Sequence, residues 1–503
     1  MALQMDFGGF DPSFLGVTIR FGSPRAWNAY QDLGASQPPA SIPRDPDEAF
    51  ETLSVASVLA HEIRHFHDFF LSPYSARVFR WRVHALVSLM QLMPFLIDEE
   101  ANCMPLPLST WSVASEAQRQ RYLAQLPRRT DGKQWNPVRV PYIDPALFNE
   151  APATTEPQDR DDAVRQLIIS ATRARSQLND LTYNPRTVRG DQSFQPWQLL
   201  ELSAMLVQMQ ELFHIYGPDA VQQFLDCLLR MEKNPYAAML NLAVDTWSQC
   251  GEYLDPRMAS AMVLWSVAGS YEVDDWKACP TERFVALWAH IMANGLPSRN
   301  TSLTDLFEQW SAALKLSTID QGLDEATAIL KRMRDALEKG MLRAQDSFLS
   351  KKYAPLLLRM VDKVIDGSRH MVGTFRADPE NYVDPMLYLE HLTDFVNPIL
   401  RIVFEGGFLQ HRLNAKQLEQ QGYIIEWAVL DADEPLIASM LKPIHLSQHA
   451  FVDPQDANEM SSMIELTDFM FSHETRNRWE VQRAGRVYFE EQTIKPLNIM
   501  TSL

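Results

Sequence analysis

The chain has 503 residues, of which 46% are hydrophobic and 22% are charged. This balance is typical of a globular protein of two or three domains and excludes a chain that is disordered throughout. The formal net charge of -18 excludes a surface that is basic all over, so we expect no nucleic-acid partner.

Neither the N-terminal sequence nor the cysteines indicate secretion. The first residues, MALQMDFGGFDPSF, contain no basic stretch followed by an apolar core, so they do not resemble a signal peptide, and no apolar run is long enough to span a membrane. The four cysteines show no CxxC spacing, which fits a reducing compartment. We therefore expect a cytoplasmic protein with no membrane partner.

The first 70 residues predict a strand, a loop and a long helix. Within residues 15–21, β-branched residues alternate with other residues, which predicts a strand. This strand could be a sheet edge beside the helix. Residues 23–48 are rich in Pro, Ser and Asp and predict a loop, in which Asp45 could cap the helix that follows. Helical spacing continues to Phe70 and stops at Ser72-Pro73.

This helix contains the sequence His61-Glu62-Ile63-Arg64-His65, an HExxH pattern. At roughly 100° per residue, His61 and His65 lie about 40° apart on one face, so two imidazoles can reach one metal ion. Glu62 lies beside them, where it could take a proton from a metal-activated water. The alternative is a chance match whose polar groups are satisfied structurally, but many apolar neighbours indicate a buried helix in which these groups need partners.

Two more polar residues follow the pattern. Asp68 lies about 20° from His61 around the helix, and we expect it to hydrogen-bond the far nitrogen of a ligand histidine rather than to bind the metal itself. His67 points to the opposite side, as a packed or surface histidine would.

The next 120 residues predict a second helix and an irregular insertion. Residues 75–98 have helical periodicity, and His84 within them, near Arg80 and Arg82, is interpreted as a structural histidine rather than a ligand. Eight prolines between residues 100 and 157 predict an insertion or a mobile covering loop with no packed regular element. A polar helix at about 159–182 and a further loop follow.

Pro196 marks the start of another helix, in which Glu201 is a lone carboxylate among apolar residues. A buried carboxylate needs a partner, and a catalytic zinc takes three protein ligands and a water, so we interpret Glu201 as the third ligand. A half-exposed glutamate favoured by the helix dipole is the alternative. The other candidates lie at helix ends or among arginines: His84, Glu99, Glu100, Glu211 and Glu252.

The remaining chain predicts helices followed by strands. Four helices are expected between residues 217 and 295, and an amphipathic scaffold region over residues 303–351. Two segments rich in Ile and Val, ending in Gly or Asp, predict strands near residues 398–407 and 422–431. Residues 458–472 predict a helix, and residues 474–492 predict a helix or an edge strand.

The HEIRH segment resembles the zinc-binding helix of the zincin metallopeptidases. The segment LLELSAML, with Glu201 four residues after Trp197, is similar to the helix that supplies the third zinc ligand in the gluzincins, although the gap between the two helices is longer here. The glycine and third histidine of the metzincin pattern are absent, since Asp68 occupies the glycine position.

We therefore expect a mainly α protein with small β elements (α+β). A zincin-like domain would occupy residues 1–300, with an irregular insertion near 100–195, and a helical and α+β region residues 301–503. The expected function is zinc-dependent hydrolysis of peptide bonds in a protein substrate, with His61, His65 and Glu201 as Zn²⁺ ligands and Glu62 as general base and later acid. The alternative is a helical scaffold or regulatory binding protein whose HExxH site is structural or vestigial.

Overall fold

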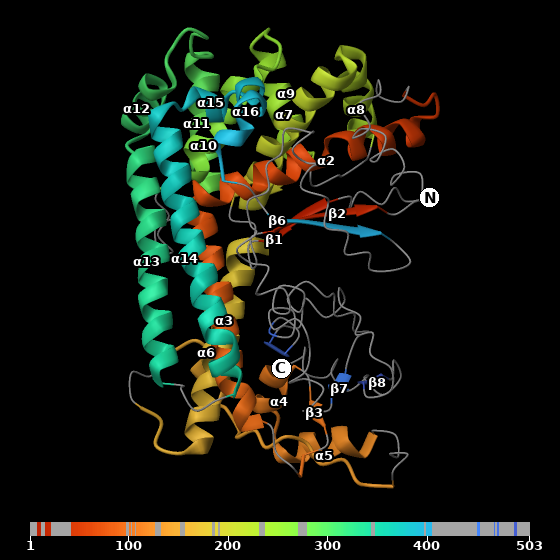
Figure 1. Cartoon of the computed structure of the whole chain (residues 1–503), viewed down its shortest axis with the longest axis vertical. Helices are drawn as coiled ribbons and strands as arrows, with labels where there is room; N and C mark the ends of the chain where they lie inside the picture. Colours follow the sequence, from red (N-terminus) through yellow and green to blue (C-terminus); the bar gives the residue numbers. More distant parts are fainter. Residues whose placement is uncertain are drawn as a thin grey trace. The chain divides into compact units, whose positions relative to one another are not determined.

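A computed structural model gives the fold (Figure 1). It describes residues 8–11, 16–21, 42–96, 100–101, 103–105, 107–125, 132–150, 156–183, 187–189, 192–230, 237–269, 279–343, 348–396, 399–404, 450–452, 467, 470–471 and 487–489. The described chain is mostly helical with short strands, as expected. No helix in these ranges is long and apolar enough to cross a membrane.

Helix α2 (Pro46–Phe70) carries the HExxH pattern and is buried over most of its circumference. Asp45 caps it as predicted, because the Asp45 carboxylate accepts hydrogen bonds from the backbone N–H groups of Asp47 and Glu48 at 3.1 and 3.0 Å. It ends at Leu71, whose N–H donates to the Asp68 carbonyl, and Pro73 then starts α3 (Pro73–Leu96).

The structure divides into two compact units, each built from three stretches of sequence. Unit 1 contains residues 1–78, 182–332 and 361–431, and unit 2 contains residues 79–181, 333–360 and 432–503. This division differs from the expected one at residue 300. Its four boundaries in the described chain fall inside the long helices α3, α6 (Arg160–Tyr183), α13 (Ile319–Arg343) and α14 (Phe348–Ala377), where no proline-rich or glycine-rich linker marks them.

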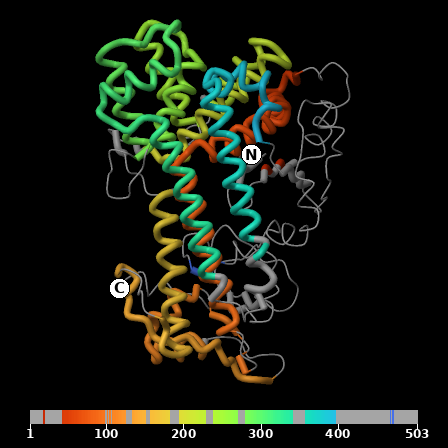
Figure 2. Tube along the Cα trace, turned by 60° about the vertical axis from the view of Figure 1, so that its left-hand side comes forward, coloured from red at the N-terminus to blue at the C-terminus, as the bar shows by residue number. Residues whose placement is uncertain are grey.

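Unit 1 is a helical body around α2 and α7 (Pro196–Tyr216), which pack directly against each other. The predicted four helices after residue 217 are present as α8 (Pro218–Arg230), α9 (Ala238–Gln249), α10 (Pro256–Val267) and α11 (Pro280–Asn294). Short elements complete it: α12 (Leu303–Leu314), α15 (Glu380–Val383), α16 (Pro385–Glu390) and the 3-10 helix η3 (Leu392–Asp394). Helices α13 and α14 lie side by side (Figures 1 and 2), and Arg376 binds Asp320 and Asp324.

Unit 1 also contains two small sheets. The predicted strand near the N-terminus is β2 (Gly16–Phe21), which lies between β1 (Gly8–Asp11) and β6 (Ile399–Phe404) (Figure 1). It is therefore a central strand rather than the expected edge, antiparallel to β1 and parallel to β6 from Gly16↔Ile399 to Phe21↔Phe404. Both β1 and β2 pack on α2. A separate hairpin joins β4 (Thr187–Arg189) and β5 (Gln192–Phe194).

Unit 2 shows that the expectation of an unpacked segment between residues 100 and 157 is wrong for its described part. This part contains β3 (Met104–Pro105), α4 (Leu108–Val113), α5 (Glu116–Gln125) and the 3-10 helix η1 (Pro145–Phe148). Val138, Val140 and Ile143 are buried although they lie in irregular backbone. Arg119 holds that backbone by donating to the carbonyls of Trp111, Ser112 and Val140. The prolines therefore end short elements without preventing a packed core.

The C-terminal expectations are only partly covered by the described residues. Strand β6 confirms the strand near residues 398–407, and β3 pairs with β7 (Ala450–Val452), which pairs with β8 (Val487–Phe489). Residues 474–492 were expected to form a helix or an edge strand, and β8 within them favours the strand. The strand expected at 422–431 lies outside the described residues, and only residues 467, 470 and 471 of the expected helix 458–472 are described, as helical.

The packing of residues 103–150 predicts a specific weak point. Arg119→Ala removes three hydrogen bonds that hold the segment around Val140, each contributing about 1 kcal/mol, so chymotrypsin should cleave this region several-fold faster than in the wild type. Arg121→Ala, an exposed change two residues along the same helix, should leave the rate unchanged. Equal cleavage rates in both variants, measured by mass spectrometry of native digests, would contradict the packed insertion.

Candidate functional site

The packing of α2 against α7 places the three predicted ligand residues around one point. The Nε2 atoms of His61 and His65 are 3.1 Å apart. The two carboxylate oxygens of Glu201 lie 3.4 Å from His61 Nε2 and 3.4 Å from His65 Nε2, respectively. One potential ligand atom from each residue lies within 4.8 Å of the other two. The structure thus brings together two imidazoles from one helix and a carboxylate from another.

These separations fit a shared metal ion. Two ligand atoms each about 2.1 Å from a tetrahedral ion are separated by about 3.4 Å. The observed separations of 3.1, 3.4 and 3.4 Å are close to this value. The residues present therefore fit a small ion with tetrahedral nitrogen and oxygen coordination.

The side chain of Glu201 is 16% exposed. This agrees better with the buried carboxylate expected from the sequence than with the half-exposed alternative. Burial raises the pKa of the Glu201 carboxyl, but the adjacent imidazoles of His65 and His61 outweigh this effect and hold that pKa well below its usual range. Burial lowers the pKa of His65, while Glu201 raises it above its ordinary value overall. Glu201 is thus a carboxylate at neutral pH, the form that binds metal.

Glu62 occupies the position next to His61 on α2 and is buried, with 6% of its surface exposed. A carboxylate is a residue type that serves as a general base. The predicted base therefore lies one residue from the ligand cluster, on the same helix.

Sequence reasoning missed Gln208, which contacts His61 on the side away from Glu201. The Nδ1 atom of His61 lies 3.0 Å from Gln208 Oε1, and Gln208 Nε2 donates to Ser57 Oγ at 3.0 Å. A signal was present, because Gln208 follows Glu201 by seven residues and so lies about 20° from it around α7. Any polar residue on that face faces the same neighbours as Glu201.

Asp68 differs from the expectation that it bonds a ligand histidine. Its Oδ1 atom instead pairs with Arg64 Nε at 3.1 Å and accepts a hydrogen bond from the Tyr382 hydroxyl at 2.5 Å. The reason is that Arg64, four residues earlier, is fully buried and needs an anionic partner on its own side of the helix. Asp68 therefore anchors α2 through Arg64 and Tyr382 and does not orient a ligand imidazole.

Arg64 and His67 anchor the back of α2 to residues 380–396. The Arg64 guanidinium lies 4.0 and 4.6 Å from the ring centroids of Tyr382 and Tyr388 and donates to the Tyr382 carbonyl. His67 Nε2 donates to the Val396 carbonyl at 2.6 Å, so its Nδ1 accepts from the Tyr388 hydroxyl at 2.6 Å. His67 is thus the packed histidine expected from its position on the helix.

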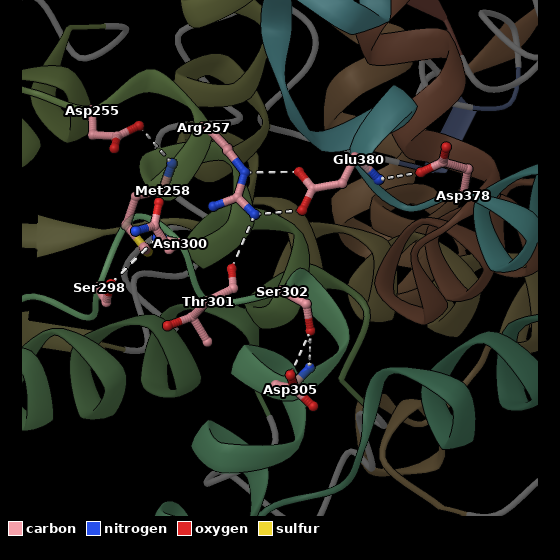
Figure 3. A network of polar contacts seen from close by, with 10 residues as sticks. All are labelled: Asp255, Arg257, Met258, Ser298, Asn300, Thr301, Ser302, Asp305, Asp378 and Glu380. Carbon is pink, nitrogen blue, oxygen red and sulfur yellow. Dashed lines mark hydrogen bonds and ion pairs between the residues drawn. The ribbon is translucent and has the colours of Figure 1, made fainter.

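A second polar network holds the segment that carries Tyr382 (Figure 3). Both guanidinium edges of Arg257, at the start of α10, bind the Glu380 carboxylate, with Nε 2.7 Å from Oε2. Arg257 also donates to the Thr301 carbonyl, and Glu380 begins α15. This bidentate pair fixes α15 two residues before Tyr382, and through Tyr382 it supports the HExxH helix.

The competing ligand candidates do not join the described cluster. His84 lies in unit 2, where its Nε2 lies 2.8 Å from Ser170 Oγ, which agrees with a structural histidine. Glu211 lies on α7 beyond Gln208, and Glu252 is exposed. Glu100 belongs to unit 2, and Glu99 lies outside the described residues.

The buried His67 predicts a pH dependence of folding. Burial lowers the pKa of His67 to about 3, whereas the unfolded chain binds this proton near pH 6.5. Because the unfolded state then binds more protons, the contribution of His67 is present above about pH 6.5 and falls by roughly 1 kcal/mol per pH unit below it.

Urea unfolding of metal-free protein from about pH 7 to pH 4 measures this slope. His67→Phe should remove that part of the slope, while Phe395→Leu, which perturbs a ring packed on His67, should keep it. Identical slopes in the wild type and His67→Phe would contradict a neutral buried imidazole.

Comparison with known proteins leaves the chemistry to be inferred from these residues. No family model, no curated protein and no solved structure matches the chain.

Proposed function

We propose that this chain is a zinc-dependent metallopeptidase that hydrolyses peptide bonds in a protein or peptide substrate. The observation that carries the proposal is the cluster of His61 Nε2 and His65 Nε2, 3.1 Å apart, with the Glu201 carboxylate, a different oxygen of which lies 3.4 Å from each nitrogen. The helix pair α2 and α7 around this cluster would be the zincin-like core, with Glu201 in the role of the gluzincin ligand.

The donor set favours zinc over other common ions. Two imidazole nitrogens with one carboxylate oxygen are the ligand types of catalytic zinc sites, whereas Ca²⁺ and Mg²⁺ prefer oxygen ligands. Three protein ligands leave one position of a tetrahedral ion for water or substrate. Imidazole also binds Cu, Fe and Ni, so the metal is chosen by ligand type and geometry together.

Access to the cluster supports a catalytic rather than a structural site. The side chains of His61, His65 and Glu201 are 13, 11 and 16% exposed, whereas those of Arg64 and Asp68 on the same helix are 1 and 2% exposed. A small part of each ligand thus faces solvent. A substrate carbonyl can approach there, which a fully enclosed structural site would not allow.

The protein's own residues would divide the chemistry as follows. His61, His65 and Glu201 would hold the zinc, which when bound would activate a water for attack and polarise the substrate carbonyl. Glu62 would take one proton from the attacking water while the oxygen of that water bonds to the carbonyl carbon. Glu62 then returns this proton to the leaving amine as the carbon–nitrogen bond breaks. One water is consumed, and a carboxylic acid and an amine are formed.

The first prediction from the proposed site concerns metal content. Purified protein never exposed to chelator should contain close to one zinc per chain, and His61→Ala, His65→Ala and Glu201→Ala should each remove it, because two remaining ligands bind too weakly. His84→Ala, a histidine bound to Ser170 in unit 2, serves as the control and should keep the metal. Elemental analysis that finds no zinc in the wild type, or loss of zinc only in His84→Ala, contradicts the site.

The second prediction separates the peptidase from a non-catalytic scaffold. Glu62→Gln keeps the size of the side chain but removes the proton acceptor, so it should keep its zinc and lose at least about 10²-fold in turnover. Mass spectrometry of a proteome-derived peptide library incubated with each protein measures cleavage. Zinc-loaded wild type that cleaves no more than Glu62→Gln would favour the scaffold and overturn the peptidase.

A further inference from the structure

A chain of directional hydrogen bonds runs from the backbone of α2 to the ligand cluster. Ser57 Oγ donates to the Leu53 carbonyl at 2.7 Å, Gln208 Nε2 donates to Ser57 Oγ at 3.0 Å, and Gln208 Oε1 lies 3.0 Å from His61 Nδ1. Ser57 is 0% and Gln208 7% exposed, so water competes little for these bonds.

The direction of each bond follows from the one before it. The Leu53 carbonyl can only accept, so the Ser57 hydroxyl donates its single proton to that carbonyl. The Ser57 oxygen can then only accept a hydrogen bond from Gln208. The amide of Gln208 must therefore turn its NH₂ group toward Ser57 and its oxygen toward His61. That oxygen can only accept, so His61 Nδ1 must carry a proton.

The consequence lies on the opposite nitrogen of the ring. A neutral imidazole has one protonated and one unprotonated nitrogen. With Nδ1 protonated, the His61 Nε2 atom that lies 3.4 Å from Glu201 presents a lone pair. This is the form that binds a metal ion.

We propose that Gln208 is a positioning residue that holds His61 as the Nδ1–H tautomer and aims its Nε2 lone pair into the cluster, with Ser57 fixing the orientation of the amide. The effect on metal affinity rests on the proposed zinc site, whereas the tautomer is a property of the metal-free protein. Gln208 touches neither metal nor substrate and acts through His61 alone.

The first test reads the tautomer directly in metal-free protein. Histidine labelled with ¹⁵N and recorded at alkaline pH, where neutral imidazoles dominate, gives distinct shifts for protonated and unprotonated ring nitrogens, and His61→Gln assigns the signals. Wild type should show His61 protonated at Nδ1. His61 protonated at Nε2 in the wild type overturns the proposal, whether or not the protein binds zinc.

The second test uses a matched series of variants. Gln208→Met keeps the size of the side chain but removes the acceptor, so it should lose the Nδ1–H signal and weaken zinc binding about 10- to 100-fold. Gln208→Glu retains an acceptor and should restore both. Gln210→Leu, a partly exposed glutamine two residues along α7, is the control and should change neither. Circular dichroism confirms that each variant is folded.

The outcomes distinguish this proposal from the zinc site itself. Zinc bound equally by wild type, Gln208→Met and Gln208→Glu leaves the metal site intact and overturns the positioning role. The wild type could instead bind no zinc and still have His61 protonated at Nδ1, with this Nδ1–H signal lost only in Gln208→Met. That result overturns the peptidase and supports the positioning role. If Gln208→Met fails to fold, the wild-type tautomer still tests the proposal, because His61 protonated at Nε2 overturns it.

Discussion

The packing of α2 against α7 is the constraint on which the candidate site depends. Helix α2 supplies two imidazoles one turn apart, but only α7 brings the Glu201 carboxylate and the Gln208 amide to the same imidazoles. Both helices are apolar on several sides, so burial of these faces fixes their relative rotation. The same contact that forms the core of unit 1 therefore assembles the ligand cluster.

The polar side chains of α2 have different roles. His61 and His65 keep part of their surface exposed beside Glu201. Next to them around the helix, Arg64 and Asp68 form a buried ion pair, with the Arg64 guanidinium over two tyrosine rings. Removing one partner of such a buried pair leaves an uncompensated charge and is costly. The buried pair therefore holds the helix in place close to the two imidazoles.

Local patterns in the sequence predicted the helices and most of the cluster. Asp45 before Pro46 marked the start of α2, and one-face spacing of His61 and His65 with a lone apolar-flanked Glu201 marked the three potential ligands. The i, i+4 spacing of Arg64 and Asp68 is itself a local signal of their ion pair. No local pattern could show the tyrosine partners of this pair, Tyr382 and Tyr388, because they lie more than 300 residues away. The unit boundaries were missed because they lie inside continuous helices, where composition does not change.

X-ray absorption at the zinc edge tests coordination by His61, His65 and Glu201, because it reports the atoms bound to the metal in the intact protein. We expect one zinc with two imidazole nitrogens and light oxygen or nitrogen ligands at about 2.0 to 2.1 Å. We also expect the zinc signal to be lost in His65→Ala. A zinc with sulfur ligands at about 2.3 Å, or a spectrum with no imidazole scattering, would contradict coordination by His61, His65 and Glu201.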